Sequence, residues 1–593
     1  MPLSWFLRHN RHMCRRAGVA ARSKQMLTSS RSVLSDSRAV PATAAPPVRL
    51  LPRRAGQPLL GAWSAAAAGG AALLLAERQR HQPGLQSTSC STLERVSLGK
   101  VANFEEGSMC EVSAGPAGAK VRVHRQGGQF YATSSASMDG FAVYKVVVDN
   151  GILYADIPSE KPAPKMVRRD PKDKRLFLLV GGGPGSLAAA ETLRQEGFGG
   201  RILILTQESH LPYDRAALSK NLERPVDSLL MRPADFLEKW DIEVQLGTSV
   251  TKVDAKGQKV QYKAAGSDKE DVLEYDRVLV ATGGSPKKLS VPGEHLPGIF
   301  TLRTPEDAAE IIKHAKRNRK IVVVGGSFIG MELASVLRKK GCDVSMIALE
   351  TVPFERSLGR KVGAAFARLL QKEGVQWYGT AQVRLFRENK RGNSIVNGVE
   401  LEDGEVLPAD AVVIGAGVLP NTKFVEGVTL DKSGGIIVGP MLSAEAAPTL
   451  FAAGDVCSYP CKSTGSQVRT EHWDVAAQQG RVAARNMLGN SEPFATMPFF
   501  WSTVFGKSFR FVGHTPRDLE EVVVEGDVSG MEFISYYTEG EDVIAVASVN
   551  KDAVALACAE LMRTGKMPKV SDFMIGIANQ EVIVQRVSNL VRR

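Results

Sequence analysis

Residues 176–206 hold the sequence pattern that most restricts how this chain can fold. The apolar run LFLLV ends in three consecutive glycines, passes into an alanine- and leucine-rich stretch, and is followed by a second apolar run, RILILT. Short apolar runs bounded by glycines, with a helical stretch between them, predict a strand, a tight turn, a helix and a second strand. Such a turn presents backbone N–H groups at a helix N-terminus, where the pyrophosphate of a dinucleotide can bind.

The same pattern recurs at residues 320–350, in the sequence KIVVVGGSFIGMELASVLRKKGCDVSMIALE. One glycine-rich turn is weak evidence, because such turns also end strands for steric reasons, but a second copy predicts two dinucleotide-binding folds. Further strand-and-turn signatures follow at residues 278–284 (VLVATGG), 411–420 (AVVIGAGVLP) and 450–455 (LFAAGD). The sequence therefore predicts an α/β protein with two Rossmann-like domains.

The order of these patterns, together with the motifs PYDRAALSK, TEHWDVAAQQGR and FFWSTVFG, matches a known family. From about residue 96 to about residue 566 the chain resembles the apoptosis-inducing factor family, and especially its apoptosis-inducing factor 3 branch. The resemblance implies an FAD-dependent NAD(P)H oxidoreductase, with FAD in the first fold and NADH, or else NADPH, in the second.

The resemblance also implies an order of domains. The FAD domain would consist of residues 175–303 and 424–490, and a nicotinamide domain at residues 304–423 would be inserted between these halves. Residues 491–593 would form a C-terminal α+β domain, which in such reductases covers the flavin and often carries a homodimer contact.

Residues 95–160 predict a small all-β domain, because alternating apolar residues surround glycine-containing turns. The order of these strands resembles the base of a Rieske domain, whose cluster needs two Cys and two His ligands. The interval at residues 131–141, where the ligands would lie, contains neither residue, and Cys110 and His124 are isolated. Either the domain is degenerate and structural, or the sequence omits coding segments. A complete chain of this sequence is predicted to contain no iron–sulfur centre and no other metal.

Residues 1–58 carry ten Arg and one Lys against one acidic residue, and so account for most of the chain's net charge of +12. The basic balance therefore does not predict a nucleic-acid partner. An Arg- and Ser-rich, acid-poor leader is typical of a transit segment, and we expect a mitochondrial protein of the inner membrane or intermembrane space. In the following segment, residues 59–94, the apolar stretch 59–76 would be a membrane anchor, a cleaved stop-transfer signal or a low-complexity leader, and the remainder a linker.

The first turn supplies the predicted FAD-binding residues Gly181 and Gly183, with Ser186 at the third position, where a small residue permits close packing of helix and strand. Gln207 and Glu208 end the second strand, where a polar or acidic side chain can hold the adenosine ribose.

The resemblance adds further FAD-binding residues. Arg215 would lie along the diphosphate, and Asp455 would accept hydrogen bonds from the ribityl hydroxyls. Glu471 and His472 would border the isoalloxazine, and Gly283 of VLVATGG joins the same cofactor-binding set.

The second turn keeps Gly325 and Gly330 but has Ser327 at its middle position, where a side chain could crowd the pyrophosphate or hydrogen-bond to it. This predicts reduced affinity for the nicotinamide nucleotide. Glu350 is the nearest acid to the end of the second strand, and no Lys or Arg follows immediately, which slightly favours NADH over NADPH. Gly417 of AVVIGAGVLP is predicted to bind cofactor as well.

The catalytic residues also come from the resemblance. Lys220 matches a lysine beside flavin N5, where a positive charge raises the flavin's electron affinity, and Glu332 matches its ion-pair partner. Phe328 matches an aromatic residue that covers the ring and yields to nicotinamide, while His472 and Trp501 line the same cleft. The protein would thus contribute positioning and electrostatics more than acid–base chemistry.

Two functions of different classes remain open. The first is an enzyme that passes electrons from NAD(P)H through FAD to a quinone, a dye-like acceptor or a separate iron–sulfur protein. The second is a redox-controlled binding protein, whose oligomeric state and partner surface change on reduction. The close pair Cys457 and Cys461 is interpreted as structural, because it lies where no redox disulfide of related reductases is found.

Overall fold

The structure is a computed structural model that describes residues 93–104, 109–114, 119–126, 129–134, 143–158, 166–389, 394–461, 465–515 and 522–591. The predicted leader and the apolar stretch at residues 59–76 lie outside these ranges. Within them, no helix has both the length and the apolar character that a membrane span requires.

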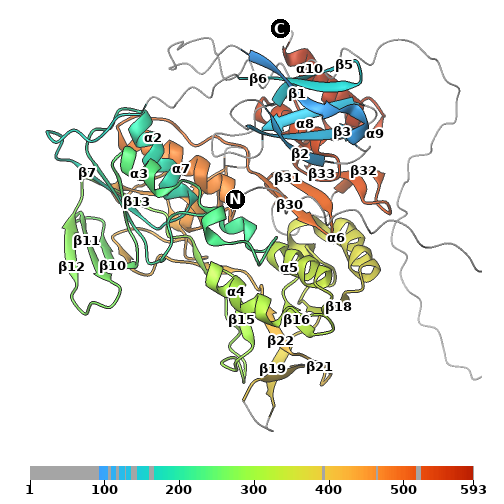
Figure 1. Cartoon of the computed structure of the whole chain (residues 1–593), viewed down its shortest axis with the longest axis horizontal. Helices are drawn as coiled ribbons and strands as arrows, with labels where there is room; N and C mark the ends of the chain where they lie inside the picture. The colour runs from blue at the N-terminus through green and yellow to red at the C-terminus, as the bar shows by residue number, and fades with distance from the viewer. Residues whose placement is uncertain are drawn as a thin grey trace, which may run out of the picture. The chain divides into compact units, whose positions relative to one another are not determined.

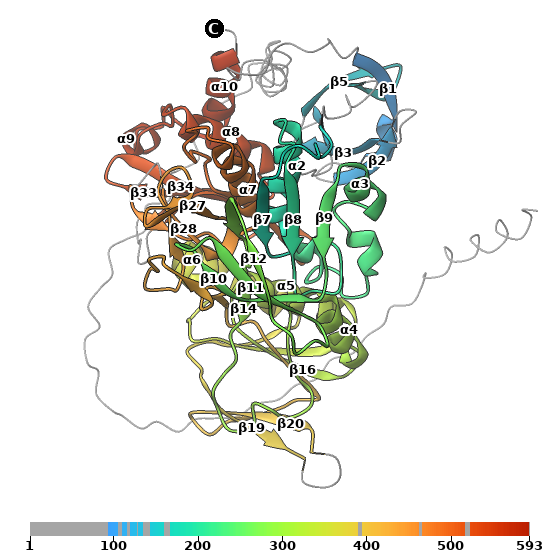
Figure 2. The ribbon, with the colours of Figure 1, turned by 90° about the vertical axis from the view of Figure 1, so that its left-hand side faces the viewer.

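The first glycine-rich pattern folds as predicted, into β7, the helix α2 (Pro184–Gln195) and β8. Every residue of β7 is buried, as expected for a central strand covered on both faces. Its sheet has the strand order β26 (Ser443–Ala444), β27 (Ala447–Ala452), β13 (Arg277–Val280), β7 (Leu176–Val180), β8 (Arg201–Leu205) and β9 (Ile242–Gln245). Figure 2 shows β7, β8 and β9 side by side, with α2 against them.

The second pattern forms a parallel sheet of the same kind, with α5 (Phe328–Lys339) following the turn. Its strand order is β15 (Ile299–Thr301), β22 (Ala411–Ile414), β16 (Lys320–Val324), β17 (Asp343–Ile347) and β18 (Gln376–Tyr378). Because β15 pairs with β22, the second fold begins before the predicted boundary at residue 304. A strand of three residues is too short to show a periodicity, so the sequence did not reveal it.

Smaller sheets complete the two folds. One sheet consists of β10 (Thr248–Asp254), β11 (Lys259–Ala264), β12 (Asp271–Glu274) and β24 (Val425–Glu426), and a second consists of β14 (Gly284–Pro286) and β23 (Val418–Pro420). A third consists of β19 (Val383–Glu388), β20 (Val396–Leu401) and β21 (Val406–Pro408), and a fourth of β25 (Ile436–Ile437), β28 (Cys457–Pro460) and β29 (Gln467–Val468). The remaining helices here are α3 (Ala234–Lys239), α4 (Pro305–His314), α6 (Glu355–Lys372) and α7 (Trp473–Met487), with 3₁₀ turns at η3 (Arg215–Ala217), η4 (Val226–Leu229) and η5 (Gly454–Val456).

The helices α2 and α7 cross in direct backbone contact. A Cβ atom at Gly480 of α7 would lie 2.1 Å from the carbonyl oxygen of Gly185 in α2, so the crossing requires glycine at this position. The contact joins the two halves of the first fold, which are far apart in the sequence. It also holds the N-terminus of α7, and thus the motif TEHWDVAAQQGR, near the first glycine-rich turn.

The C-terminal residues form an antiparallel sheet with helices on one face. The strand order is β30 (Phe499–Val504), β31 (Lys507–Gly513), β34 (Asp542–Val549), β33 (Glu532–Glu539) and β32 (Val522–Asp527), and the helices are α8 (Asp552–Arg563), α9 (Val570–Met574) and α10 (Gln580–Val591). The other face of the sheet packs Phe509 and Tyr537 into the same hydrophobic core as Phe354 and Phe366 of the second fold. Figure 1 shows β30 and β31 beside α5 and α6.

Residues 93–158 form a sheet of their own, as the β-rich pattern predicts. All neighbours are antiparallel, in the order β1 (Leu93–Lys100), β6 (Ile152–Pro158), β5 (Val143–Asp149), β4 (Gln129–Ser134), β3 (Ala119–Gln126) and β2 (Met109–Ala114), and the turn η2 (Val101–Asn103) follows β1. The backbone register pairs Cys110 with Val123 and His124 with Met109. Residues 135–142, which contain most of the interval where cluster ligands were sought, lie outside the described part of the chain.

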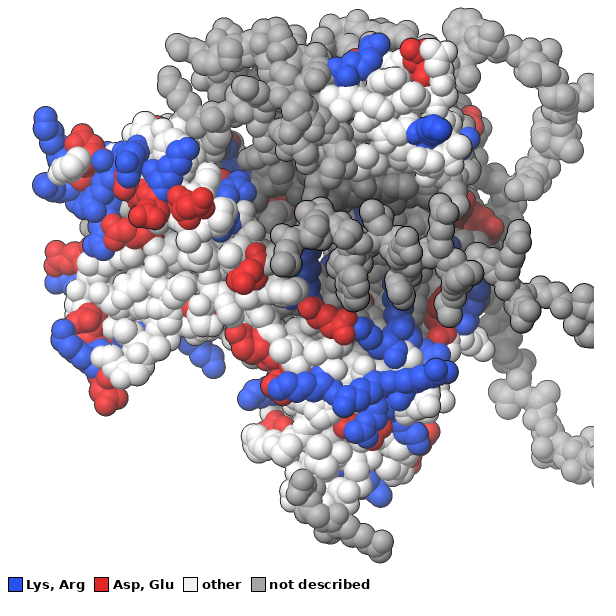
Figure 3. All heavy atoms as spheres, in the orientation of Figure 1, with Lys and Arg blue, Asp and Glu red and all other residues white. Residues whose placement is uncertain are grey.

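Charged side chains of both signs cover the described surface. Figure 3 shows basic and acidic residues interspersed over the face it presents. Many of the basic residues are paired with acids, for example Lys313 with Glu310 at 2.5 Å and Arg319 with Asp410 at 2.7 Å. This mixture agrees with the near-neutral balance that remains after the basic leader is set aside.

Candidate active site

A cleft of about 1070 Å³ runs between the two dinucleotide folds and the C-terminal sheet. It brings together most of the predicted site residues, although they are scattered over more than three hundred residues of sequence. Those that line the cleft are Gly181, Gly183, Gln207, Glu208, Arg215, Lys220, Gly283, Phe328, Glu332, Asp455, Glu471, His472 and Trp501.

The other predicted residues lie elsewhere. Ser186 is fully buried in α2, where its hydroxyl has no hydrogen-bond partner among the described residues. The second-turn residues and their neighbours lie at the carboxyl edge of the second sheet, outside the lining of this cleft: Gly325, Ser327, Gly330, Glu350 and Gly417.

One end of the cleft is the first glycine-rich turn. Gly181 has a φ of +112°, and a Cβ atom there would lie 2.4 Å from the carbonyl oxygen of Ala281. The turn ends at Gly183, the N-cap residue of α2, which has no side chain to accept hydrogen bonds from the first N–H groups of the helix. These donors therefore remain for an anionic ligand, as a dinucleotide pyrophosphate requires.

Two guanidinium groups, each paired with a carboxylate, lie near this end. The guanidinium of Arg215 donates to the carboxylate of Glu208 and to the carbonyl oxygen of Arg303. Burial, and then the charge of Arg215, lower the pKa of Arg303, whose Nη2 lies 3.5 Å from Asp455 Oδ2. Two guanidinium groups confined in one cleft favour an anion beside them. The donor set and the uncapped helix thus fit the diphosphate of FAD.

Arg303 was not among the predicted site residues. It stands alone between β15 and α4, and no spacing or periodicity in the sequence marks it. Asp455, which the sequence did identify, is also held on its backbone side, since Arg469 Nη1 donates to its carbonyl oxygen at 3.0 Å. Arg469 forms an ion pair with Glu471 at 2.6 Å, so Glu471 lies at the cleft but is already engaged.

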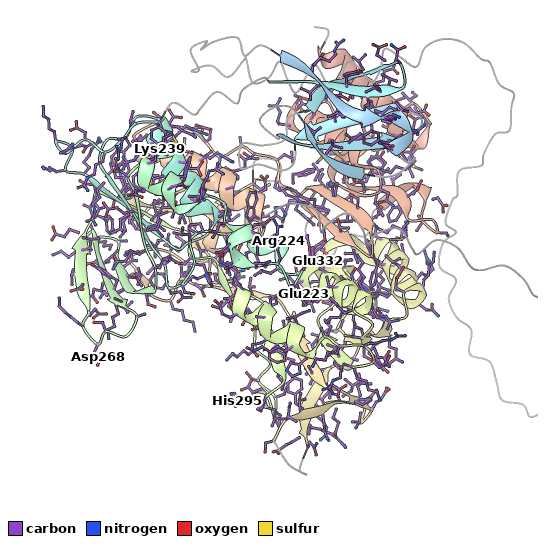
Figure 4. All side chains as sticks on the ribbon, in the orientation of Figure 1. Glu223, Arg224, Lys239, Asp268, His295 and Glu332 are labelled. Carbon is purple, nitrogen blue, oxygen red and sulfur yellow. The ribbon has the colours of Figure 1, made fainter. Side chains whose placement is uncertain are left out.

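The middle of the cleft holds the predicted ion pair. Lys220 Nζ lies 3.0 Å from Glu332 Oε1, although the two residues belong to different dinucleotide folds. Figure 4 labels Glu332 on α5, beside the segment with Glu223 and Arg224 that directly follows Lys220. The ammonium of Lys220 is thereby fixed on the wall of the cleft.

Aromatic rings form the wall opposite the first fold. The ring centroid of Phe500 lies 4.7 Å from that of Phe328 and 5.5 Å from that of His472, and the centroid of Trp501 lies 5.2 Å from that of His472. Burial, with a smaller contribution from Lys220, lowers the pKa of His472 to about 3, so its imidazole is neutral at physiological pH. His472 Nδ1 accepts a hydrogen bond from the N–H of Asp474 at 3.2 Å, which leaves the proton on Nε2.

The second turn repeats the geometry of the first. Ser327 is the N-cap residue of α5, with φ −98° and ψ −171°, and its exposed side chain makes no capping hydrogen bond. Glu350, predicted to meet the ribose, forms an ion pair with Arg356 Nε at 2.7 Å. Arg356 lines the cleft and was missed, because it follows Glu350 by six residues instead of immediately.

The two close cysteines are not part of this site. Cys457 and Cys461 are both buried, and burial raises the pKa of the Cys457 thiol far above its ordinary value. A thiol in this state is inert, in agreement with the structural role expected from the sequence.

Comparisons with known proteins cover the same part of the chain. The family model "Pyridine nucleotide-disulphide oxidoreductase" matches residues 177–480, and the model "Reductase C-terminal" matches residues 499–574. Apoptosis-inducing factor 3 of Homo sapiens is 40% identical over 392 residues, which cover 66% of this chain and 63% of that protein. The chain therefore matches less than two thirds of the length of this relative.

Bacterial reductases are matched over nearly their whole length. The anthranilate 1,2-dioxygenase system ferredoxin–NAD(+) reductase component of Burkholderia cepacia is 32% identical over 408 residues, which cover 68% of this chain and 98% of that protein. Among solved structures, the covalent putidaredoxin reductase–putidaredoxin complex matches with a TM-score of 0.65 and 26% identity, covering 71% of this chain and 100% of the other.

Proposed function

Because this chain belongs to the pyridine nucleotide-disulphide oxidoreductase family, we propose that it is an FAD-dependent oxidoreductase that takes electrons from NADH and delivers them to a separate protein. The family and the 40% identity to apoptosis-inducing factor 3 confirm the resemblance and the α/β fold expected from the sequence. The Rieske-type origin of residues 95–160 stays a prediction.

The observation that carries the proposal is the ion pair of Lys220 and Glu332 in a cleft shared by both dinucleotide folds. The residues that would hold FAD are the turn at Gly181 and Gly183, with Arg303 and Asp455. When bound, FAD supplies two-electron uptake from a nicotinamide and one-electron release to an acceptor.

The side chains of the cleft prepare it for a hydride donor. The ammonium of Lys220, paired with Glu332, lies where negative charge would develop on a bound flavin and would stabilise that charge. Neutral His472 adds no competing charge, and Phe328 and Trp501 belong to the aromatic wall of the cleft. The protein thus acts by position and charge, with no group needed to abstract a proton.

We further propose that the acceptor is a small iron–sulfur protein and not a quinone. The relatives named as ferredoxin–NAD(+) reductase components, and the solved complex with putidaredoxin, support this choice of partner. Phe499 and Trp501 of β30 line the cleft on the side of the C-terminal domain, where a protein partner could approach it.

The purified chain without its leader should be yellow and should oxidise NADH at a steady rate when a [2Fe–2S] ferredoxin and cytochrome c are added. Replacement of the ferredoxin by a soluble quinone should slow turnover strongly. A folded protein that takes up no FAD would sink the proposal. Slow reduction by NADH, followed by a long-lived complex and a change in mass, would support the redox-controlled binding protein instead.

For the location, we propose import into mitochondria by the leader at residues 1–58. Its Arg excess and near absence of acidic residues support this address. A fusion of residues 1–95 to a fluorescent reporter tests it, and a reporter that stays in the cytosol would contradict it.

A further inference from the structure

A buried carboxylate lies where three parts of the molecule meet. The side chain of Glu332 ends in a carboxyl group, yet the residue is only 5% exposed. It belongs to α5 of the second fold, one helical turn after Phe328. A carboxylate removed from water is strongly destabilised unless hydrogen bonds and opposite charge replace its hydration. The partners of Glu332 therefore decide where its oxygens lie.

Both oxygens of Glu332 accept a hydrogen bond from a serine. Oε1 accepts one from Ser502 Oγ at 2.5 Å, and Oε2 accepts one from the hydroxyl of Ser219. Ser502 is a residue of β30 in the C-terminal sheet and is 2% exposed, whereas Ser219 precedes Lys220 in the first fold and is 6% exposed. The carboxylate is thus held from two sides by different domains.

The direction of the Lys220 ammonium depends on that carboxylate. An ammonium group has three N–H donors. One is directed to the carbonyl oxygen of Ala216, at 2.9 Å from Nζ, and Nζ also forms an ion pair with Glu332 Oε1 at 3.0 Å. Among the described residues Nζ has no other partner, and Lys220 lines the cleft. If Glu332 moved, the ammonium would lose the charge that holds it in this position.

We propose that Ser502 and Ser219 are positioning residues, whose hydroxyl groups fix the Glu332 carboxylate and thereby fix the Lys220 ammonium on the wall of the cleft. The proposal rests on the proposed function in so far as Lys220 serves a bound flavin. Through Ser502, the C-terminal domain controls a charge that belongs to the two dinucleotide folds.

The same sheet provides matched controls. Ser535 of β33 and Ser548 of β34 are fully buried serines whose hydroxyls have no hydrogen-bond partner among the described residues. Substitution of either one by alanine makes the same chemical change as Ser502→Ala, in the same sheet, without touching Glu332. A purely structural role of buried serines predicts the same behaviour at all three positions.

The test is competitive acetylation of lysines in the full-length protein, measured by mass spectrometry with exposed Lys239 as the internal reference. Ser502→Ala and Ser219→Ala should each raise the relative labelling rate of Lys220 by about tenfold, the size expected for one hydrogen bond to a charged group. Ser548→Ala should leave it unchanged. Ser502→Thr, which retains the hydroxyl, should return the rate to near that of the wild type.

A double-mutant cycle separates positioning from general loosening. In a Glu332→Gln background, Ser502→Ala should have no further effect on the labelling of Lys220, because the carboxylate that it holds is already gone. Equal labelling in Ser502→Ala and Ser548→Ala, or additive effects in the cycle, would overturn the proposal.

Turnover provides a second measurement. Ser502→Ala should lower kcat for NADH oxidation by about tenfold with little change in KM, because the Lys220 ammonium is no longer held in the position that stabilises the transition state. The labelling experiment needs no turnover, so absence of NADH oxidation would refute the proposed function and leave the role of the serines to be decided by the labelling.

Discussion

The two glycine-rich turns have the same backbone but place their substitutions at different positions. In each, the first glycine adopts a positive φ, +112° at Gly181 and +122° at Gly325, and a Cβ atom would lie within 2.4 Å of a carbonyl oxygen. The first glycine is therefore required by the protein itself, in both turns, before any ligand is considered.

The middle position differs. Gly183 and Ser327 have almost identical backbone angles, with φ −97° and ψ −177° at Gly183 and φ −98° and ψ −171° at Ser327. A Cβ atom at Gly183 would meet nothing nearer than 3.9 Å. Extended backbone of this kind accepts any residue, so the fold does not require glycine at the middle position.

At the third position it is the second turn that has glycine and the first turn that has serine. A Cβ atom at Gly330 would lie 2.1 Å from the carbonyl oxygen of Gly325, whereas Ser186 occupies the equivalent place in α2 with its whole side chain buried. The helix α5 lies closer to its turn than α2 does. Each turn has thus kept glycine where its own packing demands it.

The largest expected effect is on the free energy of unfolding and concerns substitutions at the third position of each turn. Gly330→Ala should destabilise the protein by about 2–3 kcal/mol, because the new methyl group must displace backbone atoms. Ser186→Ala should change stability by less than about 1 kcal/mol, since it removes a buried hydroxyl that has no partner. Urea unfolding measures both, and equal losses would show that the two helices approach their turns alike.

A serine at the middle position of the first turn comes next. Gly183→Ser should weaken FAD binding by about tenfold, or 1.4 kcal/mol, while the unfolding free energy of the FAD-free protein stays unchanged. Fluorescence titration with FAD and urea unfolding provide the two measurements. A loss of stability without a loss of affinity would mean that the fold, and not the ligand, needs this glycine.

The converse change should have a smaller effect. Ser327→Gly should tighten NADH binding by about threefold to fivefold, because the nucleotide pyrophosphate gains room but loses the hydrogen bond that an exposed hydroxyl can offer. Isothermal titration calorimetry of the FAD-loaded protein measures the change, with FAD content as the control. Weaker binding would show that Ser327 donates to the pyrophosphate.

The smallest effect concerns coenzyme choice at the second turn. Arg356→Ala should raise the preference for NADH over NADPH by about threefold, because it frees Glu350 for the ribose and removes a cation that could meet a 2′-phosphate. The ratio of kcat/KM for the two coenzymes measures it. Arg360→Ala is the matched control, since Arg360 lies on the same helix and pairs with Glu355 at 2.6 Å. The same ratio in both variants would remove Glu350 from the ribose site.

The sequence predicted the features that depend on neighbouring residues and missed those that depend on residues far apart in the chain. The strands and helices around both turns were predicted correctly, because apolar runs and glycines determine the local backbone conformation. Ser502 and Arg303 were missed, since each is a single polar residue that gains its meaning only from partners far away in the sequence. The pair of Lys220 and Glu332 came from family resemblance, and no periodicity could have supplied it.

The pairing of β13 with β27 has a consequence for how the chain acquires its shape during synthesis. Val278 pairs with Leu450, so about 170 residues, including the whole second fold, must emerge before the first sheet is complete. At about 5–20 residues per second, the edge of β13 stays open for roughly ten to thirty seconds on the ribosome. The inserted second fold can form in that time, whereas the flavin site cannot form until β27 has been synthesised. FAD is therefore expected to bind late in folding. Before it binds, the unpaired edge of β13 is the part of the chain most prone to aggregation.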